Sequence, residues 1–248
     1  PFNVASYSAV KWAQLGMVVD VYASDLTTLK ASARTITAIN TTSGQITFDG
    51  AAQNTVSTDV LVRTGSINRE ITGFAAIVNT GNTLYNIVPG AEPTWQANVN
   101  ANGGTNRALS EGLMIQMVDQ CRINGDTPTV IFSNLGVRRA YFNLLTQQRR
   151  YTSTMEFDGG FKGLAFTTDK GDIPLVVDVD CPDNTLYFIN EPNLKVYRSQ
   201  DWSFMDRDGS RWQRVVGYDA YEAVMYTYME VGAHRRNVHA KLADITEG

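Results

Sequence analysis

The stretch from Asn184 to Thr246 constrains the fold of this chain more than any other part of the sequence. It is rich in aromatic and β-branched residues, which favour strands, and polar turns separate its segments. The strand-like segments are 184–198, 201–209, 219–232 and 235–246. Few of the residues between them are of the kinds that carry catalysis. The stretch therefore predicts a succession of strands joined by turns.

Residues 219–231 fit either a helix or a strand. Their Glu, Ala and Met residues favour a helix, whereas Tyr221, Val224 and Tyr226 favour a strand. As a strand, the segment would be apolar on both faces, which suits a sheet covered on both sides or a contact between subunits. We therefore predict two long strands, 220–231 and 236–245, with Gly232 at the bend between them.

Composition limits the class of protein. The chain has 248 residues, of which 43% are hydrophobic, enough for one large domain or two modest ones. A formal net charge of −4 argues against a protein that coats nucleic acid, because such proteins carry a strong basic excess. No apolar run approaches the ~20 residues that span a bilayer, so we expect no membrane as a partner.

The N-terminal region from residue 16 to 66 predicts a small β-rich module. Its strand candidates are 17–22, 34–39, 45–48 and 59–63. The second and third flank Asn40–Gly44, a polar segment typical of a hairpin loop.

The rest of the chain mixes helices with strands. Leu109, Leu113, Met117 and Cys121 recur every four residues, which predicts a helix over 107–124. A second helix is expected over 135–148, with Ser133 as its cap. Further strands are expected at 129–132, 161–166, 173–179, 185–189 and 194–197. More strand than helix in this order indicates the α+β class.

Residues that could carry chemistry have simpler explanations. Cys121 and Cys181 are too few for a disulfide framework, and we interpret both as reduced and buried. His234 and His239 would lie on opposite faces of a strand, which favours ordinary surface or interface histidines over a metal site. The acidic segments 178–183 and 206–209 lack the full length of a calcium loop and are typical of polar turns. We predict no metal, no cofactor and no catalytic residues.

Three arginine pairs stand out in an acidic chain. Nucleic-acid contact, ion pairing between subunits and a solvated surface all remain open for them, although guanidinium groups suit interfaces well. Tryptophan, like arginine, is enriched among the residues that contribute most to binding at protein interfaces. Our candidates for the subunit interface are Arg138, Arg139, Arg149, Arg150, Trp202, Trp212, Arg235 and Arg236.

Three blocks of sequence, in this order, resemble the major capsid proteins of tailed bacteriophages of the Hong Kong 97-like type. The first runs from Arg107 through Pro128 to Leu145. The second joins Arg149–Leu164 to Ile173–Asp178, and the third is the stretch after Asn184. The resemblance covers about 105–248, and its specificity lies in the ordered set of blocks.

The resemblance implies a fold with an axial domain near the capsomer centre and a peripheral domain that reaches neighbours. It suggests five parts: 1–15, a remnant of the N-terminal or peripheral region; 16–66, an inserted β-rich module; 67–106, a connecting or peripheral segment; 107–210, an axial-type α+β domain; and 211–248, C-terminal strands that return to the peripheral domain.

The resemblance also implies a structural function. Identical copies would form pentamers and hexamers of an icosahedral shell that packages double-stranded DNA. The partners would be identical subunits, with decoration, scaffold or portal proteins as further candidates and non-specific genomic DNA at the inner face. The protein would be assembled in the host cytoplasm and reside in the virion capsid.

Two rival functions belong to other classes. A carbohydrate-binding module would use exposed aromatic residues such as Trp95, Trp202 and Trp212. A carboxylate-dependent hydrolase would lose its turnover when one catalytic Asp or Glu is substituted. The sequence does not single out a pair of carboxylates that could act as its acid and base.

Overall fold

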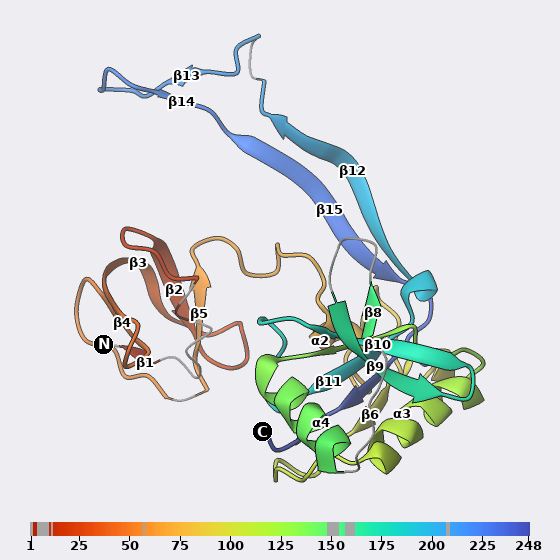
Figure 1. Cartoon of the computed structure of the whole chain (residues 1–248). Coiled ribbons are helices and arrows are strands. Elements are labelled where there is room, and N and C mark those ends of the chain that lie inside the picture. Colours follow the sequence, from red (N-terminus) through yellow and green to blue (C-terminus); the bar gives the residue numbers. More distant parts are fainter. Residues whose placement is uncertain are drawn as a thin grey trace. The chain divides into compact units, whose positions relative to one another are not determined.

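The structure is a computed structural model. It describes residues 2–3, 10, 12–56, 58–147, 154–156, 162–206 and 209–248. The chain divides into two compact units, 1–70 and 71–248. Each unit is described by itself, with its elements labelled as in Figure 1.

The first unit is an antiparallel sheet in the order β1-β4-β3-β2-β5. Its strands are β1 (Phe2–Asn3), β2 (Val18–Tyr22), β3 (Leu29–Asn40), β4 (Gln45–Phe48) and β5 (Val60–Arg63). The predicted hairpin loop is present, and the side chain of Asn40 accepts hydrogen bonds from the N–H groups of Thr42 and Ser43. The buried Asp20 accepts from the Ala33 N–H at 2.7 Å and the Thr64 hydroxyl at 2.8 Å.

The second unit is built on a seven-stranded sheet in the order β6-β16-β11-β7-β10-β9-β8. The strands are β6 (Asn98–Asn100), β7 (Val130–Ser133), β8 (Thr154–Glu156), β9 (Lys162–Thr168), β10 (Gly171–Val177), β11 (Leu186–Ile189) and β16 (Ala240–Leu242). The pairs β7–β10 and β6–β16 are parallel, and the other neighbours are antiparallel. Together with two helices, this mixed sheet confirms the α+β class.

Alternate residues of the central strands face two different layers. Ile131, Leu186 and Phe188 belong to a core that includes residues of the two helices. Their neighbours Val130 and Tyr187 belong to a second core on the other face, which residues from 74 to 97 cover. Both faces of the sheet are therefore buried, which explains why all four residues of β11 are apolar and buried.

The two long helices differ from the prediction at their N-terminal ends: one begins later than expected, and the other has a different cap. Helix α3 (Glu111–Ile123) is preceded by Ser110, whose side chain accepts from the Leu113 N–H, so residues 107–110 are not helical. Helix α4 (Leu135–Gln147) is capped by Asn134, whose side chain accepts from the Val137 N–H at 2.8 Å. The prediction of Ser133 as the cap is wrong, because Ser133 is still the last residue of β7.

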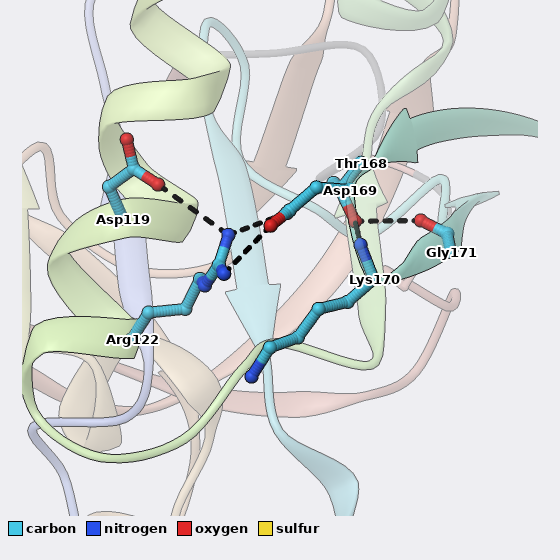
Figure 2. Close-up of polar contacts among 6 residues, drawn as sticks. All are labelled: Asp119, Arg122, Thr168, Asp169, Lys170 and Gly171. Atoms are coloured by element: carbon cyan, nitrogen blue, oxygen red, sulfur yellow. Dashed lines mark hydrogen bonds and ion pairs between the residues drawn. The ribbon is translucent and has the colours of Figure 1, made fainter.

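The β9–β10 turn is tied to α3 by an exposed ion pair (Figure 2). The two terminal nitrogens of Arg122 donate to the two carboxylate oxygens of Asp169 at 2.6 and 2.9 Å, and Asp119 lies 3.9 Å away. The hydrogen bonds from Arg122 hold the pKa of Asp169 below its usual range. Thr168 closes the turn by donating from its hydroxyl to the Gly171 carbonyl at 2.7 Å. The pair fixes the turn at the protein surface.

Residues 194–233, here called the arm, form a long hairpin that leaves the body of the second unit (Figure 1). Its strands are β12 (Leu194–Phe204), β13 (Gln213–Arg214), β14 (Tyr221–Glu222) and β15 (Met225–Ala233). The short helices near its base are α2 (Phe74–Ile77), η1 (Pro93–Trp95) and η2 (Glu191–Asn193).

Two predictions about the C-terminal strands need correction. Gly232 lies inside β15 instead of at a bend, and the ring of Tyr197 packs where a Cβ atom at Gly232 would stand. The strand expected at 236–245 is reduced to β16, which pairs with β11 and β6 inside the seven-stranded sheet. The expected domain boundary near residue 210 falls within the arm.

Both cysteines are free and buried, as predicted. Burial raises the pKa of each thiol to about 12, so both stay protonated at neutral pH. The expectation for His239 is wrong, because its side chain is 0% exposed, whereas His234 is exposed.

Candidate functional site: an exposed two-stranded arm

The register of the arm separates its side chains into two faces. Directly paired residues share a face, and successive residues alternate. One face is mainly aliphatic and carries the pairs Val196–Val231, Arg198–Met229 and Phe204–Met225. The opposite face is rich in tyrosine and carries the pairs Tyr197–Glu230, Gln200–Tyr228 and Ser203–Tyr226. Register shifts after Arg198 and Gln200 maintain this division.

Neither face of the arm is covered along most of its length. Among the described residues, β12 and β15 pair only with each other. Val196, Phe204 and Met225 on the aliphatic face are exposed, as are Tyr197 and Tyr228 on the other. A two-stranded hairpin is at best marginally stable in water, and monomeric proteins rarely expose apolar patches of this extent. The arm therefore has the character of a surface that another molecule covers.

The far end of the arm is also apolar. Strands β13 and β14 pair through Gln213–Glu222 and Arg214–Tyr221. The exposed large side chains of this end are Trp212, Val216, Tyr218 and Tyr221, and Val216 is 95% exposed. Aromatic residues beside arginine are enriched at the buried centres of protein interfaces.

At its base, the arm is attached to residues 71–97, here called the collar. The Thr72 N–H donates to the side chain of Glu230 at 2.7 Å, and the Tyr85 hydroxyl donates to the Val231 carbonyl. Leu194, Val231 and Ala233 pack in the same core as the collar residues. The aliphatic face of the arm thus begins in the protein core and continues into solvent.

The structure separates the eight predicted interface residues into groups. Trp202 and Trp212 lie on the arm and are 60% and 66% exposed. Arg138 and Arg139 are exposed on α4, and Arg139 donates to the Gly248 carbonyl at 2.6 Å. Arg149 and Arg150 lie outside the described residues.

Arg235 and Arg236 have their contacts within the chain. Arg235 is half-buried and donates to the Asn124 carbonyl at the end of α3. Arg236 is 0% exposed, and within the described part of the chain its guanidinium donates to oxygen atoms of residues 76–82 alone. A side chain without exposed surface cannot contact a neighbour directly, so Arg236 is removed from the interface candidates.

Most of the exposed apolar residues of the arm were not among the candidates. The missed residues are Val196, Tyr197, Phe204, Met225 and Tyr228 on β12 and β15, and Val216, Tyr218, Tyr221 and Val224 toward the far end. A signal was present in the sequence, since residues 219–231 are apolar on both faces of the expected strand. That pattern is expected both for a strand in a covered sheet and for a strand at a subunit contact. The pairing and exposure of β15 argue against a covered sheet within the described part of the chain.

The rival functions have less support. Trp95, one of three aromatic residues expected to bind sugar, is 6% exposed and donates from its ring N–H to the Leu84 carbonyl at 3.1 Å. Within the described part of the chain, no group of three or more His, Cys, Asp or Glu residues could hold a metal ion. In the same part, no helix has the length and hydrophobicity needed to cross a membrane.

Comparison with known proteins identifies the family. The sequence model of the SU10 major capsid protein family matches residues 47–246, most of the chain. The chain belongs to the SU10 major capsid protein family. The resemblance to phage major capsid proteins is thereby confirmed, and the arm is a feature of a structural protein of the virion.

Two solved structures are similar to this family member. A chain of the cyanophage A-1(L) capsid asymmetric unit is 19% identical with a TM-score of 0.47, and the match covers 68% of this chain and 55% of the other. A chain of the holo-SrpI encapsulin complex from Synechococcus elongatus PCC 7942 is 14% identical with a TM-score of 0.47, with coverage of 66% and 56%. The chain thus spans little more than half the length of these relatives. No curated protein sequence matches it.

Proposed function

We propose that this chain assembles with identical copies, as pentamers and hexamers, into an icosahedral shell that encloses double-stranded phage DNA. The observation that carries the proposal is the arm, whose apolar side chains are exposed on both faces in the single chain. Membership of a major capsid protein family supports identical subunits as the partner that covers them.

The arm suits the geometry of a shell. An extended hairpin gives a long contact with a neighbour, and repeated contacts around each subunit reinforce one another through multivalency. Trp202, Trp212 and the tyrosines of the arm would form the buried centre of this contact, because large aromatic residues dominate interface energies. Arg138, Arg139, Arg149 and Arg150 remain candidates for a second contact.

The arrangement proposed for the subunit is Hong Kong 97-like. The seven-stranded sheet with α3 and α4 would form the axial part near the capsomer centre. The arm would belong to the peripheral part that reaches neighbours, and residues 16–66 would be an inserted module. Contact with DNA would be non-specific and confined to the inner face, in keeping with the net charge of −4. Decoration, scaffold and portal proteins are further candidate partners.

Negative-stain electron microscopy of the full-length protein, beside light scattering, tests the proposal. We expect closed shells or capsomer rings at concentrations where the scattering mass rises well above that of a monomer. A protein that stays monomeric at every salt and protein concentration would contradict the proposal. Binding to a sugar array by that monomer would favour the carbohydrate-binding alternative, for which Trp202 and Trp212 remain exposed.

A further inference from the structure

Arg236 is a buried cation with an unusual set of partners. Its Nε donates to the Ile77 carbonyl at 2.6 Å, and its two terminal nitrogens reach three further carbonyls and one side-chain amide oxygen. These acceptors are the carbonyls of Ala76 at 2.9 Å, Asn79 at 2.7 Å and Asn82 at 3.0 Å, and the Asn82 side chain. No carboxylate pairs with Arg236 among the described residues.

A buried charge without a carboxylate is unfavourable unless dipoles surround it. The carbonyl groups of α2 and of the loop after it converge on the guanidinium and supply these dipoles. Conversely, only a planar guanidinium can donate in so many directions at once, since a lysine has one nitrogen with three N–H groups. Burial lowers the pKa of Arg236, but an arginine side chain remains charged at neutral pH.

The carbonyls that Arg236 holds belong to the collar, and Arg236 itself lies shortly after the arm in the chain. Two residues, His234 and Arg235, separate it from the end of β15. The backbone N–H groups of Arg236 and Asn237 also donate to the Thr94 carbonyl, at 3.3 and 3.2 Å, near the other end of the collar. The side chain and backbone of one residue therefore contact both halves of the collar at the base of the arm.

Among the described residues, the other contacts between arm and collar are two single hydrogen bonds and one area of apolar packing. They are the hydrogen bond from the Thr72 N–H to Glu230, the hydrogen bond from Tyr85 to Val231, and apolar packing of Leu194, Val231 and Ala233. A long two-stranded hairpin acts as a lever, so a small rotation at its base displaces its far end by a large distance. The contact that holds the base thus determines where Trp212 and its neighbours lie.

We propose that Arg236 is a positioning residue that locks the collar to the base of the arm and so sets the direction of the arm. Arg236 contributes to assembly by setting the direction of the arm, and it does not itself contact a neighbouring subunit. This consequence for assembly rests on the proposed function, whereas the positioning itself is a property of the single subunit.

Pulsed electron paramagnetic resonance on dispersed full-length subunits tests the positioning. Nitroxide labels at Ser199→Cys on the arm and Ile123→Cys on α3 report the distance between arm and body, since both sites are exposed. The native cysteines are buried and would react poorly. We expect a single narrow distance distribution in the parent and at least a twofold wider one in Arg236→Lys.

Arg235→Lys is the matched control, because Arg235 contacts the end of α3 and not the collar. Its distribution should equal that of the parent. An Arg236→Lys protein that is folded by circular dichroism and as narrow as the parent overturns the proposal.

Should Arg236→Lys fail to fold, Asn82→Ala decides the matter, since it removes the side-chain oxygen that accepts from Arg236 and the amide that donates to the Ala76 carbonyl. A wider distribution in Asn82→Ala supports the proposal, and a parent-like width refutes it. Shell formation is scored separately by electron microscopy. If the variants form shells and their distance distributions are as narrow as that of the parent, the positioning role of Arg236 is rejected and the proposed function stands.

Discussion

Strands β11 and β12 follow one another in the chain and end in opposite environments. All four residues of β11 (Leu186–Ile189) are buried, whereas nine of the eleven residues of β12 (Leu194–Phe204) are exposed. Only residues 190–193 separate them. Strand β11 lies between β16 and β7 with a layer on each face. Among the described residues, β12 pairs with β15 alone, and beyond Leu194 no layer covers it. The residue composition of both segments favours a strand. The position of each strand in its sheet determines whether its side chains are buried or exposed.

Replacing one phenylalanine in each strand gives the largest contrast. Phe188→Ala in β11 removes a fully buried ring from the core below the helices, and we expect a loss of about 3–5 kcal/mol in the free energy of unfolding. Phe204→Ala in β12 removes an exposed ring and should cost less than about 1 kcal/mol. Urea denaturation of dispersed subunits measures both. Equal losses would mean that the arm is packed on the body.

The pH dependence of stability tests the buried side of this comparison. His239 lies in the body, where burial lowers its pKa to about 4, and its Nδ1 accepts from the Asn190 N–H at 3.1 Å. Asp126 and Arg236 are the charged groups that act on it, and the backbone of Arg235 lies beside it. The unfolded chain binds a proton near pH 6.5 but the folded chain does not, so stability should fall as pH drops from about 6.5 to about 4.

The expected loss over that window is about 3 kcal/mol. Urea midpoints between pH 7.5 and pH 4 measure it. His239→Gln should flatten the slope. A slope that survives in His239→Gln would assign the pH dependence to other groups.

A smaller effect is expected at the start of α4. Asn134→Ala removes the cap of the helix and a hydrogen bond to Glu247, which should lower the unfolding free energy by about 1–2 kcal/mol. Asn143→Ala on the exposed side of the same helix is the matched control and should change it by less than about 0.5 kcal/mol. Thermal melts of the two variants check the difference. Similar melting temperatures would refute the capping role of Asn134.

The smallest effect on folding is expected in the arm, together with a large effect on assembly. Trp202→Ser combined with Trp212→Ser should change the unfolding free energy by less than about 0.5 kcal/mol, because both rings are exposed. The protein concentration needed for assembly should rise at least about tenfold. Light scattering against concentration measures the second quantity. Unchanged assembly would exclude these two rings from the interface.

Much of the fold could be predicted from local sequence. Strands β2 to β5 of the first unit, α3 and most strands of the large sheet follow from periodicity and turn residues, whereas β1 was not expected. The cap of α4 could not be assigned securely, because Ser133 and Asn134 are both good cap residues and only the end of β7 distinguishes them. The burial of Trp95, Arg236 and His239 depends on contacts between distant segments, which no local pattern reports.

The candidate site was predicted only in part. Trp202 and Trp212 do lie on the exposed arm. Arg236 was misjudged because its exposure depends on the collar, more than a hundred residues earlier in the sequence. The two faces of the arm depend on register shifts at Arg198 and Gln200, which composition alone does not indicate.

Hydroxyl-radical footprinting of full-length protein, dispersed and assembled, tests the central claim most directly. The account predicts that Trp202, Trp212 and Tyr228 are oxidised several-fold more slowly in shells than in dispersed subunits, while Ile123 on α3 serves as the reference on the body. Equal oxidation of the three arm residues in both states would contradict the claim that neighbouring subunits cover the arm.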